Sequence, residues 1–295
     1  MERRLEPPRK VGTTPESLFS NLADRLLLDV SFLEKIWTLL QDRRQVVFYG
    51  PPGTGKTFVA REFAREIAGN EAVTLVQFHP SYAYEDFVEG YRPDPQAGSF
   101  RLMEGALKRA ARRALDEPGR PHFLIIDEIN RGNVAKVCGE LYFLLEYRDE
   151  AIRLQYSEEP FSLPDNLYLI GTMNTADRSI ALIDAALRRR FHFVGFFPHD
   201  PGSVGRVLER WLSRHKPELA WLNDMVERAN AHLDRNGAIR PSHFMKGDLD
   251  EAKIELIWEH SILPYVEEVF FGDESRLDDF RMDRLRRADQ EGAPL

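Results

Sequence analysis

The chain has 295 residues, 40 basic and 48 acidic side chains, and a net charge of −8. This length exceeds the usual size of one domain, so we expect a large domain and a smaller one. The acidic balance argues against a surface that binds nucleic acid throughout, although a local basic rim or pore is compatible with it.

The single cysteine, Cys138, excludes an intrachain disulfide and predicts a reducing compartment. The chain has no run of about 18 apolar residues, and its first residues lack the apolar segment of a signal peptide. We therefore expect a soluble cytoplasmic protein that does not contact a membrane. Residues 1–44 form a charged segment followed by apolar residues at helical spacing, which predicts one or two N-terminal helices.

A phosphate-binding loop is predicted at residues 50–57, where the sequence fits G-x-x-x-x-G-K-[ST] between an apolar strand and a helical pattern. Its glycines allow backbone N–H groups to point at a phosphate, and the helix that follows adds its positive end. Lys56 is predicted to contact the β- and γ-phosphates, and the hydroxyl of Thr57 to bind Mg²⁺. The predicted nucleotide-binding residues are Gly50, Pro51, Pro52, Gly53, Thr54, Gly55, Lys56 and Thr57.

A second strand is predicted at residues 73–78, and an aromatic and acidic stretch follows it at residues 79–93, before a turn-rich segment at 94–99. The stretch has little periodicity, and three interpretations are open: an ordinary surface loop, a substrate or pore loop, or a subunit interface. The helix predicted at 104–116 has a basic face, which is typical of a solvated surface.

Two carboxylates end the apolar run at residues 122–128. Such a run predicts a buried parallel strand that delivers its acids to the carboxyl edge of the sheet, where ligands bind in open α/β folds. Asp127 is then expected to hold Mg²⁺, and Glu128 to polarise the attacking water.

A further helix is predicted at 134–145, a hairpin at 151–163, and another buried strand at 166–174. Asn174 ends this strand and is expected to orient the attacking water or to contact the γ-phosphate; the alternative is an asparagine that caps a turn. Arg188, Arg189 and Arg190 close a short helix, where they either complement its negative end or offer a cation to a phosphate in a neighbouring subunit. A fifth strand is predicted at 192–197.

A Pro- and Gly-containing stretch at 198–202 predicts a domain boundary, beyond which the pattern is helical at 205–215, 218–235 and 250–270. Between the last two helices, Arg240 or Ser242 could reach the nucleotide. The sequence thus predicts an α/β core at 45–198, with a parallel five-stranded sheet flanked by helices, and a smaller helical domain at 199–295.

This ordered set of motifs resembles the AAA+ superfamily. The sequence M-N-T-A-D-R-S at residues 173–179, with Asp-Glu-Ile-Asn-Arg at 127–131 and Tyr-Glu-Asp-Phe at 84–87, is similar to the McrB branch, the motor subunits of modification-dependent restriction systems. The resemblance implies a hexameric ring of identical chains that hydrolyses a nucleoside triphosphate between subunits. It also implies an McrC-like partner that carries the nuclease, so that DNA is met indirectly, through the ring or the partner.

The resemblance also assigns roles to matching residues. Asp127 and Glu128 correspond to the Walker B pair and Asn174 to sensor 1. Residues 239–245 match the sensor 2 region, although many relatives have glycine in place of Arg240. The residues expected near the nucleotide of a neighbouring subunit are Asp177, Arg178, Arg188, Arg189 and Arg190, with Arg189 favoured as the arginine finger.

Several alternatives stay open at this stage. GTP is favoured slightly over ATP as the substrate, and no guanine-reading N-K-x-D motif is present. Family members usually carry an N-terminal domain that reads methylated DNA, whereas about 40 residues precede the first strand here, so we expect that domain to be removed or supplied by another subunit. The main alternative function is a MoxR-like ATP-dependent chaperone that remodels proteins, and a third is a scaffold that does not hydrolyse nucleotide.

Overall fold

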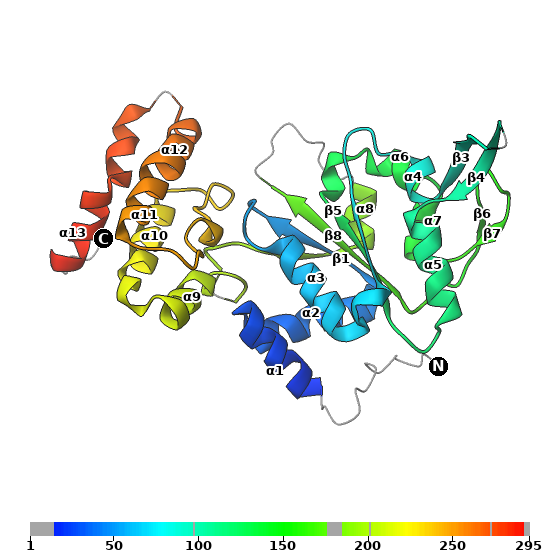
Figure 1. Ribbon diagram of the computed structural model, residues 1–295, viewed down its shortest axis with the longest axis horizontal. Helices are drawn as coiled ribbons and strands as arrows, with labels where there is room; N and C mark the ends of the chain where they lie inside the picture. Colours follow the sequence, from blue (N-terminus) through cyan, green and yellow to red (C-terminus); the bar gives the residue numbers. More distant parts are fainter. Residues whose placement is uncertain (1–14, 97, 176–184, 201, 272, 292–295) are drawn as a thin grey trace. The chain divides into compact units, whose positions relative to one another are not determined.

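The computed structural model describes residues 15–96, 98–175, 185–200, 202–271 and 273–291 (Figure 1). Its contacts divide the chain into two compact units, each described by itself below. Unit 1 comprises the N-terminal residues up to Leu26 together with residues 30–49 and 56–195. Unit 2 comprises residues 27–29, 50–55 and 196–295. The domain limits predicted at 44/45 and 198/199 remain a prediction.

A parallel five-stranded sheet forms the centre of unit 1, in the order β2-β5-β8-β1-β9 (Figure 1). The strands are β1 Gln45–Gly50, β2 Val73–Gln77, β5 His122–Asp127, β8 Leu167–Asn174 and β9 His192–Gly195. Because β5 and β8 are parallel neighbours, with Ile126 opposite Gly171, their carboxyl ends meet at one edge of the sheet. The predicted fold class is confirmed.

Helices cover both faces of this sheet, which explains why its strands are almost continuously apolar. On one face the rings of Phe123 and Tyr168 stack with centroids 5.2 Å apart, and Trp37 lies 5.5 Å from Tyr168. On the other face Leu124 and Ile126 pack into a core that includes Leu107. The helices of unit 1 are α1 Pro15–Leu26, α2 Val30–Arg43, α3 Lys56–Ala68, α4 Tyr84–Phe87, α5 Ala106–Asp116, α6 Val134–Cys138, α7 Leu141–Glu146 and α8 Ala185–Arg190, with short turns η1 Asn70–Ala72 and η2 Ile129–Arg131.

Two antiparallel hairpins lie beside the sheet: β3 Glu89–Asp94 with β4 Ser99–Glu104, and β6 Ile152–Arg153 with β7 Pro160–Phe161. The second was predicted, but the first was not, because side chains on both of its faces are mostly exposed and show no apolar alternation. The helix predicted at 134–145 is wrong as a continuous element. Gly139, at a φ of 47°, separates α6 from α7.

A buried carboxylate joins the two hairpins. The side chain of Glu89 is 0% exposed and accepts hydrogen bonds from Lys108 Nζ at 2.7 Å, Ser157 N at 2.8 Å and Tyr156 N at 3.3 Å. Lys108 also pairs with the exposed Glu159 at 3.0 Å. We call Glu89, Lys108, Tyr156, Ser157 and Glu159 the hairpin junction. It fixes the β6–β7 turn to the base of the β3–β4 hairpin.

The C-terminal part of unit 2 is helical, which confirms the predicted smaller helical domain, called the lid from here on. Its helices are α9 Val207–His215, α10 Trp221–Ala231, α11 Glu251–Ile257, α12 Leu263–Val269 and α13 Met282–Glu291, with short turns η3 Pro217–Leu219, η4 Pro241–His243 and η6 Glu274–Phe280. A π-helical turn, η5 Trp258–Ile262, joins α11 to α12. Trp258 is 2% exposed, and its Nε1 donates to the Phe280 carbonyl at 2.8 Å, which ties η5 to η6.

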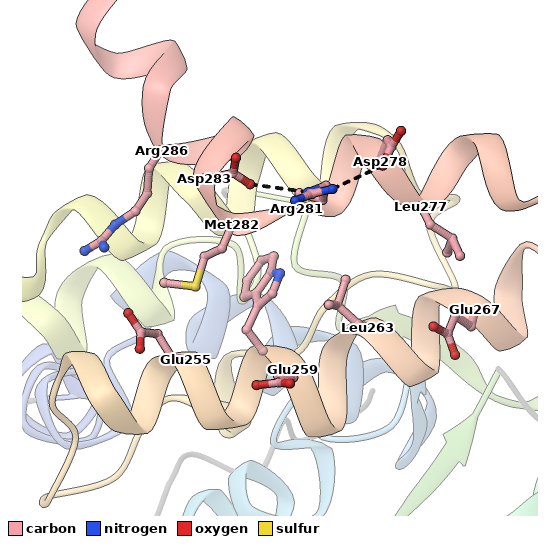
Figure 2. A pocket seen from close by; sticks show the side chains of 11 residues that line it. Glu255, Glu259, Leu263, Glu267, Leu277, Asp278, Arg281, Met282, Asp283 and Arg286 are labelled. Atoms are coloured by element: carbon pink, nitrogen blue, oxygen red, sulfur yellow. Dashed lines mark ion pairs between the residues drawn. The ribbon is translucent and has the colours of Figure 1, made fainter.

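A groove of about 710 Å³ runs between the η5–α12 side of the lid and residues 277–286 (Figure 2). Arg281 bridges Asp278 at 3.9 Å and Asp283 at 3.6 Å along its wall. The carboxylates that line the groove are Glu255, Glu259, Glu267, Asp278 and Asp283. They outnumber its two arginines, so the groove carries a negative charge. Among the described residues, no helix combines the length and apolar character needed to cross a membrane.

Candidate active site

The predicted metal-binding oxygens lie in contact with each other. Asp127 ends β5 and Thr57 lies in the first turn of α3, and Thr57 Oγ1 donates to Asp127 Oδ1 at 2.6 Å. Lys56, the first residue of the same helix, is 5% exposed. The described residues include no cluster of three or more His, Cys, Asp or Glu side chains that could hold a metal. A hydroxyl and one carboxylate suit Mg²⁺, which keeps most of its waters and takes phosphate oxygens as ligands.

Glu128 follows Asp127 and is held by three neighbours. Its backbone has a φ of 54°, in the left-handed region that a glutamate rarely adopts, and its N–H donates to Thr172 Oγ1 at 3.2 Å. Its carboxylate accepts from Asn174 Nδ2 and, at 3.2 Å, from Arg131 Nε. The structure thus brings together Glu128 and Asn174, two residues that the sequence places 46 positions apart.

The electrostatics of Glu128 suit a group that takes up a proton. Burial raises the pKa of the Glu128 carboxyl above its usual range, and the nearby Asp127 adds to this. The charges of Arg131 and Lys56 act in the opposite direction without cancelling the rise. A raised pKa lies closer to neutral pH, where a general base works best.

Three residues of this site were missed by sequence reasoning. Thr172 contacts both acids, Arg131 pairs with Glu128, and the Nδ2 of the buried Asn130 donates to the Asn174 carbonyl at 3.3 Å. The signal for Thr172 was an aliphatic hydroxyl near the end of an apolar strand, two positions before Asn174 and therefore on the same face of β8. Asn130 and Arg131 follow the acids closely in the sequence, but it is the turn η2 that brings their side chains back to the site.

In unit 2, Gly53 of the phosphate-binding loop lies close to the predicted sensor 2 segment. Gly53 has a φ of 72°, and a Cβ there would lie 2.5 Å from Arg240 Cδ and 2.7 Å from Ser242 Oγ. A Cβ at Gly50 would lie 2.2 Å from the Phe196 carbonyl oxygen. Any side chain at these two positions would therefore clash. Arg240 and Ser242 therefore border the loop at Gly53, and their contact with the nucleotide stays a prediction.

The arginine run lies at the other edge of the sheet. Arg190 precedes β9, so in a parallel sheet it lies at the amino edge, opposite the edge where β5 ends at Asp127. Arg188 and Arg189 are exposed, whereas Arg190 pairs with Glu146 at 2.6 Å and lies over the ring of Tyr142. The structure therefore does not bring these arginines to the acids of their own chain. Asp177 and Arg178 lie outside the described residues.

A half-buried cation, Arg148, supports this arginine edge. Arg148 donates to Gln45 Oε1 at 2.8 Å and to the carbonyls of Leu167 and Pro164, and burial lowers its pKa to about 9, with the charge of Arg44 adding to the effect. Gln45 Nε2 in turn donates to the Arg190 carbonyl at 2.9 Å. The Arg148–Gln45 pair therefore fixes the end of α8.

Comparison with known proteins identifies two family domains. Residues 45–191 match the AAA domain of the dynein-related subfamily, and residues 216–278 match the alpha-helical lid domain of McrB. The chain is 37% identical over 292 residues to the type IV methyl-directed restriction enzyme EcoKMcrB subunit of Escherichia coli (strain K12), covering 90% of this chain and 62% of that protein. It is 29% identical over 203 residues to the type II restriction enzyme BsuMI component YdiS of Bacillus subtilis (strain 168), covering 55% of this chain and 59% of that protein.

A weaker similarity, 24% identity over 285 residues, links 87% of the chain to 10% of neuron navigator 2 of Homo sapiens. The chain spans about three fifths of the length of each of the two restriction-enzyme relatives. The AAA domain, the McrB lid domain and the similarity over nine tenths of the chain all agree with the geometry of the site. The chain belongs to the AAA+ ATPases, within their McrB-like branch.

Proposed function

We propose that the protein is a Mg²⁺-dependent nucleoside triphosphatase that serves as the motor of an McrBC-like, modification-dependent DNA restriction complex. One observation carries the proposal: Thr57, in the first turn of α3, contacts Asp127 at the end of β5, and Asn174, at the end of the adjacent strand β8, contacts Glu128, so the residues proposed to bind the metal and to activate water lie close together. The two restriction-enzyme relatives and the McrB lid match support the restriction role.

Each residue has a defined task in the proposed reaction. Lys56, with the loop residues 50–55, binds the β- and γ-phosphates, while Thr57 and Asp127 hold the ion. Bound Mg²⁺ would neutralise charge on the phosphate oxygens. Ionised Glu128 accepts a proton from the attacking water, and the Asn174 amide, which already donates to Glu128 Oε1, orients the carboxylate and the water. Arg240 and Ser242 contact the nucleotide from the lid side of the loop.

The remaining roles require a second copy of the chain. The exposed Arg188 and Arg189 lie at the sheet edge opposite their own acids, so we propose that they act on a neighbour's nucleotide, with Arg189 as the finger. Arg190 is held by Glu146 and is assigned the nearby supporting position. Asp177 and Arg178 are proposed to act at the same interface. A hexameric ring, an McrC-like nuclease partner, indirect contact with DNA and a cytoplasmic location complete the proposal.

The decisive experiment measures steady-state hydrolysis of GTP and ATP side by side, with the oligomer size determined by light scattering in each nucleotide. We expect Mg²⁺-dependent turnover, somewhat faster with GTP, in the fraction that assembles into a ring. Turnover by a strictly monomeric protein would contradict the shared site. The absence of turnover with both nucleotides in the assembled protein would overturn the proposed function.

A further inference from the structure

Thr172 is a buried hydroxyl in an otherwise apolar part of β8. It is 2% exposed, and a buried hydroxyl costs free energy unless it is hydrogen-bonded. Its Oγ1 donates to Asp127 Oδ1 and accepts from the Glu128 N–H at 3.2 Å. One hydroxyl therefore uses its donor on the first acid and a lone pair on the backbone of the second.

These two bonds constrain different properties of the site. The bond to Asp127 fixes the rotation of the carboxylate whose Oδ1 also accepts from Thr57. The bond to the Glu128 N–H satisfies a backbone group that the left-handed conformation of Glu128 turns toward β8. Thr57 has a second proposed task as a metal ligand, whereas the Thr172 hydroxyl contacts only the two acids among the residues that the structure describes. Thr172 is thus suited to hold both acids whether or not the metal is bound.

The neighbouring residue allows the close approach that this contact requires. A Cβ at Gly171 would lie 3.1 Å from Ile129 Cδ1 and 3.2 Å from Val47 Cγ2, which is tighter than an ordinary contact. The glycine therefore lets the turn η2, which follows Glu128, pack directly against β8. Packing alone would be served equally well by valine at position 172, because valine has the shape of threonine and suits a buried strand.

We propose that Thr172 is a positioning residue that orients Asp127 for Mg²⁺ and Glu128 for water activation. This inference rests on the proposed function, because it assigns a task within the same site. Residues that orient the ligands of a metal commonly change metal affinity or activity by about 10–100-fold when they are removed.

The test compares Thr172→Val, which keeps the shape and removes the hydroxyl, with Thr172→Ser, which keeps the hydroxyl. Binding of fluorescent GTP and ATP analogues is titrated at equilibrium with and without Mg²⁺, and turnover is measured separately. We expect Thr172→Val to raise the Mg²⁺ concentration for half-maximal tight binding by about tenfold or more and to lower kcat by about 10–100-fold. Nucleotide affinity without Mg²⁺ should stay within about twofold, and Thr172→Ser should restore most of both losses.

Thr74→Val is the matched control, since Thr74 lies in β2 of the same sheet and contacts Arg113 rather than the acids. If Thr172→Val does not fold, Thr172→Ala takes its place under the same criteria, and Thr172→Ser must in any case keep the Mg²⁺ dependence of the natural chain. Unchanged Mg²⁺ dependence in the variant without a hydroxyl overturns the inference. Equal weakening of nucleotide binding with and without Mg²⁺ also overturns it, because that pattern indicates a purely structural role.

Failure of the proposed function would be seen in the unsubstituted chain, without any Thr172 variant. It appears as an absence of hydrolysis in the unsubstituted chain, whereas failure of the inference appears in the comparison of that chain with Thr172→Val, as an unchanged Mg²⁺ dependence or an equal loss of binding with and without Mg²⁺. Equilibrium binding of nucleotide in Mg²⁺ tests Thr172 even in a protein that turns over neither nucleotide.

Discussion

Two glutamates of unit 1 occupy polar networks of opposite design. In the hairpin junction, burial opposes ionisation of Glu89, but the Lys108 ammonium and the Ser157 N–H outweigh it and hold the pKa of that carboxyl below its usual range. In the active site, burial raises the pKa of Glu128, and the positive charges of Arg131 and Lys56 do not reverse the rise. The donors around Glu89 therefore stabilise its ionised form, whereas Glu128 binds a proton more readily than an ordinary glutamate.

This difference shows how a glutamate becomes structural or reactive. Three donors converge on Glu89, two of them from the β6–β7 turn, so its charge stabilises the fold. The donors to Glu128 are Asn174 and Arg131, which contact it from the sheet edge where the nucleotide is proposed to bind. The same contacts can therefore take part in the proposed reaction. We therefore expect substitutions at Glu128 to change turnover and substitutions at Glu89 to change the free energy of unfolding.

The largest expected effect is on turnover. Glu128→Gln should lower kcat by about 10²–10⁴-fold, because the amide cannot accept the proton from water. Nucleotide binding and the melting temperature should be retained, since the side chain keeps its shape. Single-turnover hydrolysis and thermal unfolding measure the two quantities. A Glu128→Gln protein that hydrolyses nucleotide at the normal rate would contradict the proposed catalytic role of Glu128.

The second effect is on stability. Glu89→Gln should lower the free energy of unfolding by about 3 kcal/mol, because it removes the charge that compensates the nearly buried Lys108. Glu159→Gln is the control: this carboxylate is 65% exposed, so its loss should cost less than about 1 kcal/mol. Urea unfolding of both variants provides the measurement. Equal losses in the two variants would mean that burial of Glu89 does not strengthen its contact with Lys108.

A third effect concerns coupling within the junction. Lys108→Met should cost less in a Glu89→Gln background than in the natural chain, with a difference of about 1–3 kcal/mol, because each single change leaves one polar partner buried and unpaired. A double-mutant cycle followed by urea unfolding gives this coupling energy. Additive costs would contradict a direct interaction.

The smallest effects are those of pH, and they arise from pKa shifts of opposite sign. The raised pKa of Glu128 predicts that turnover is present at high pH and falls as the pH drops through that value, above the usual glutamate value of about 4.3. The lowered pKa of Glu89 predicts stability that is present above about 4.3 and is lost as the pH falls through its lower folded value. A turnover loss that coincides with unfolding would mean that the acid limb does not report on Glu128.

Sequence reasoning was sufficient where a residue's role follows from its place at the end of an element. Lys56, Asp127 and Asn174 were predicted because each directly starts a helix or ends an apolar strand. Thr172 and Glu89 were not, because their roles depend on partners from other strands and turns. The β3–β4 hairpin lacks a buried face, so no periodicity marked it. The break at Gly139 needed a backbone angle that a single glycine in a helical pattern does not predict.

The contact of Arg148 with the buried Gln45 has a consequence for how sequences of this type diverge. Its guanidinium donates to the side chain of Gln45, and Gln45 reaches the carbonyls of Leu145 and Arg190 with its amide. A change of either residue alone would leave a buried polar group without its partner. Positions 45 and 148 should therefore vary as a pair among descendants of a common ancestor. A chain with an apolar residue at position 45 should have lost the arginine at 148, and a chain with an apolar residue at 148 should have lost the amide at 45.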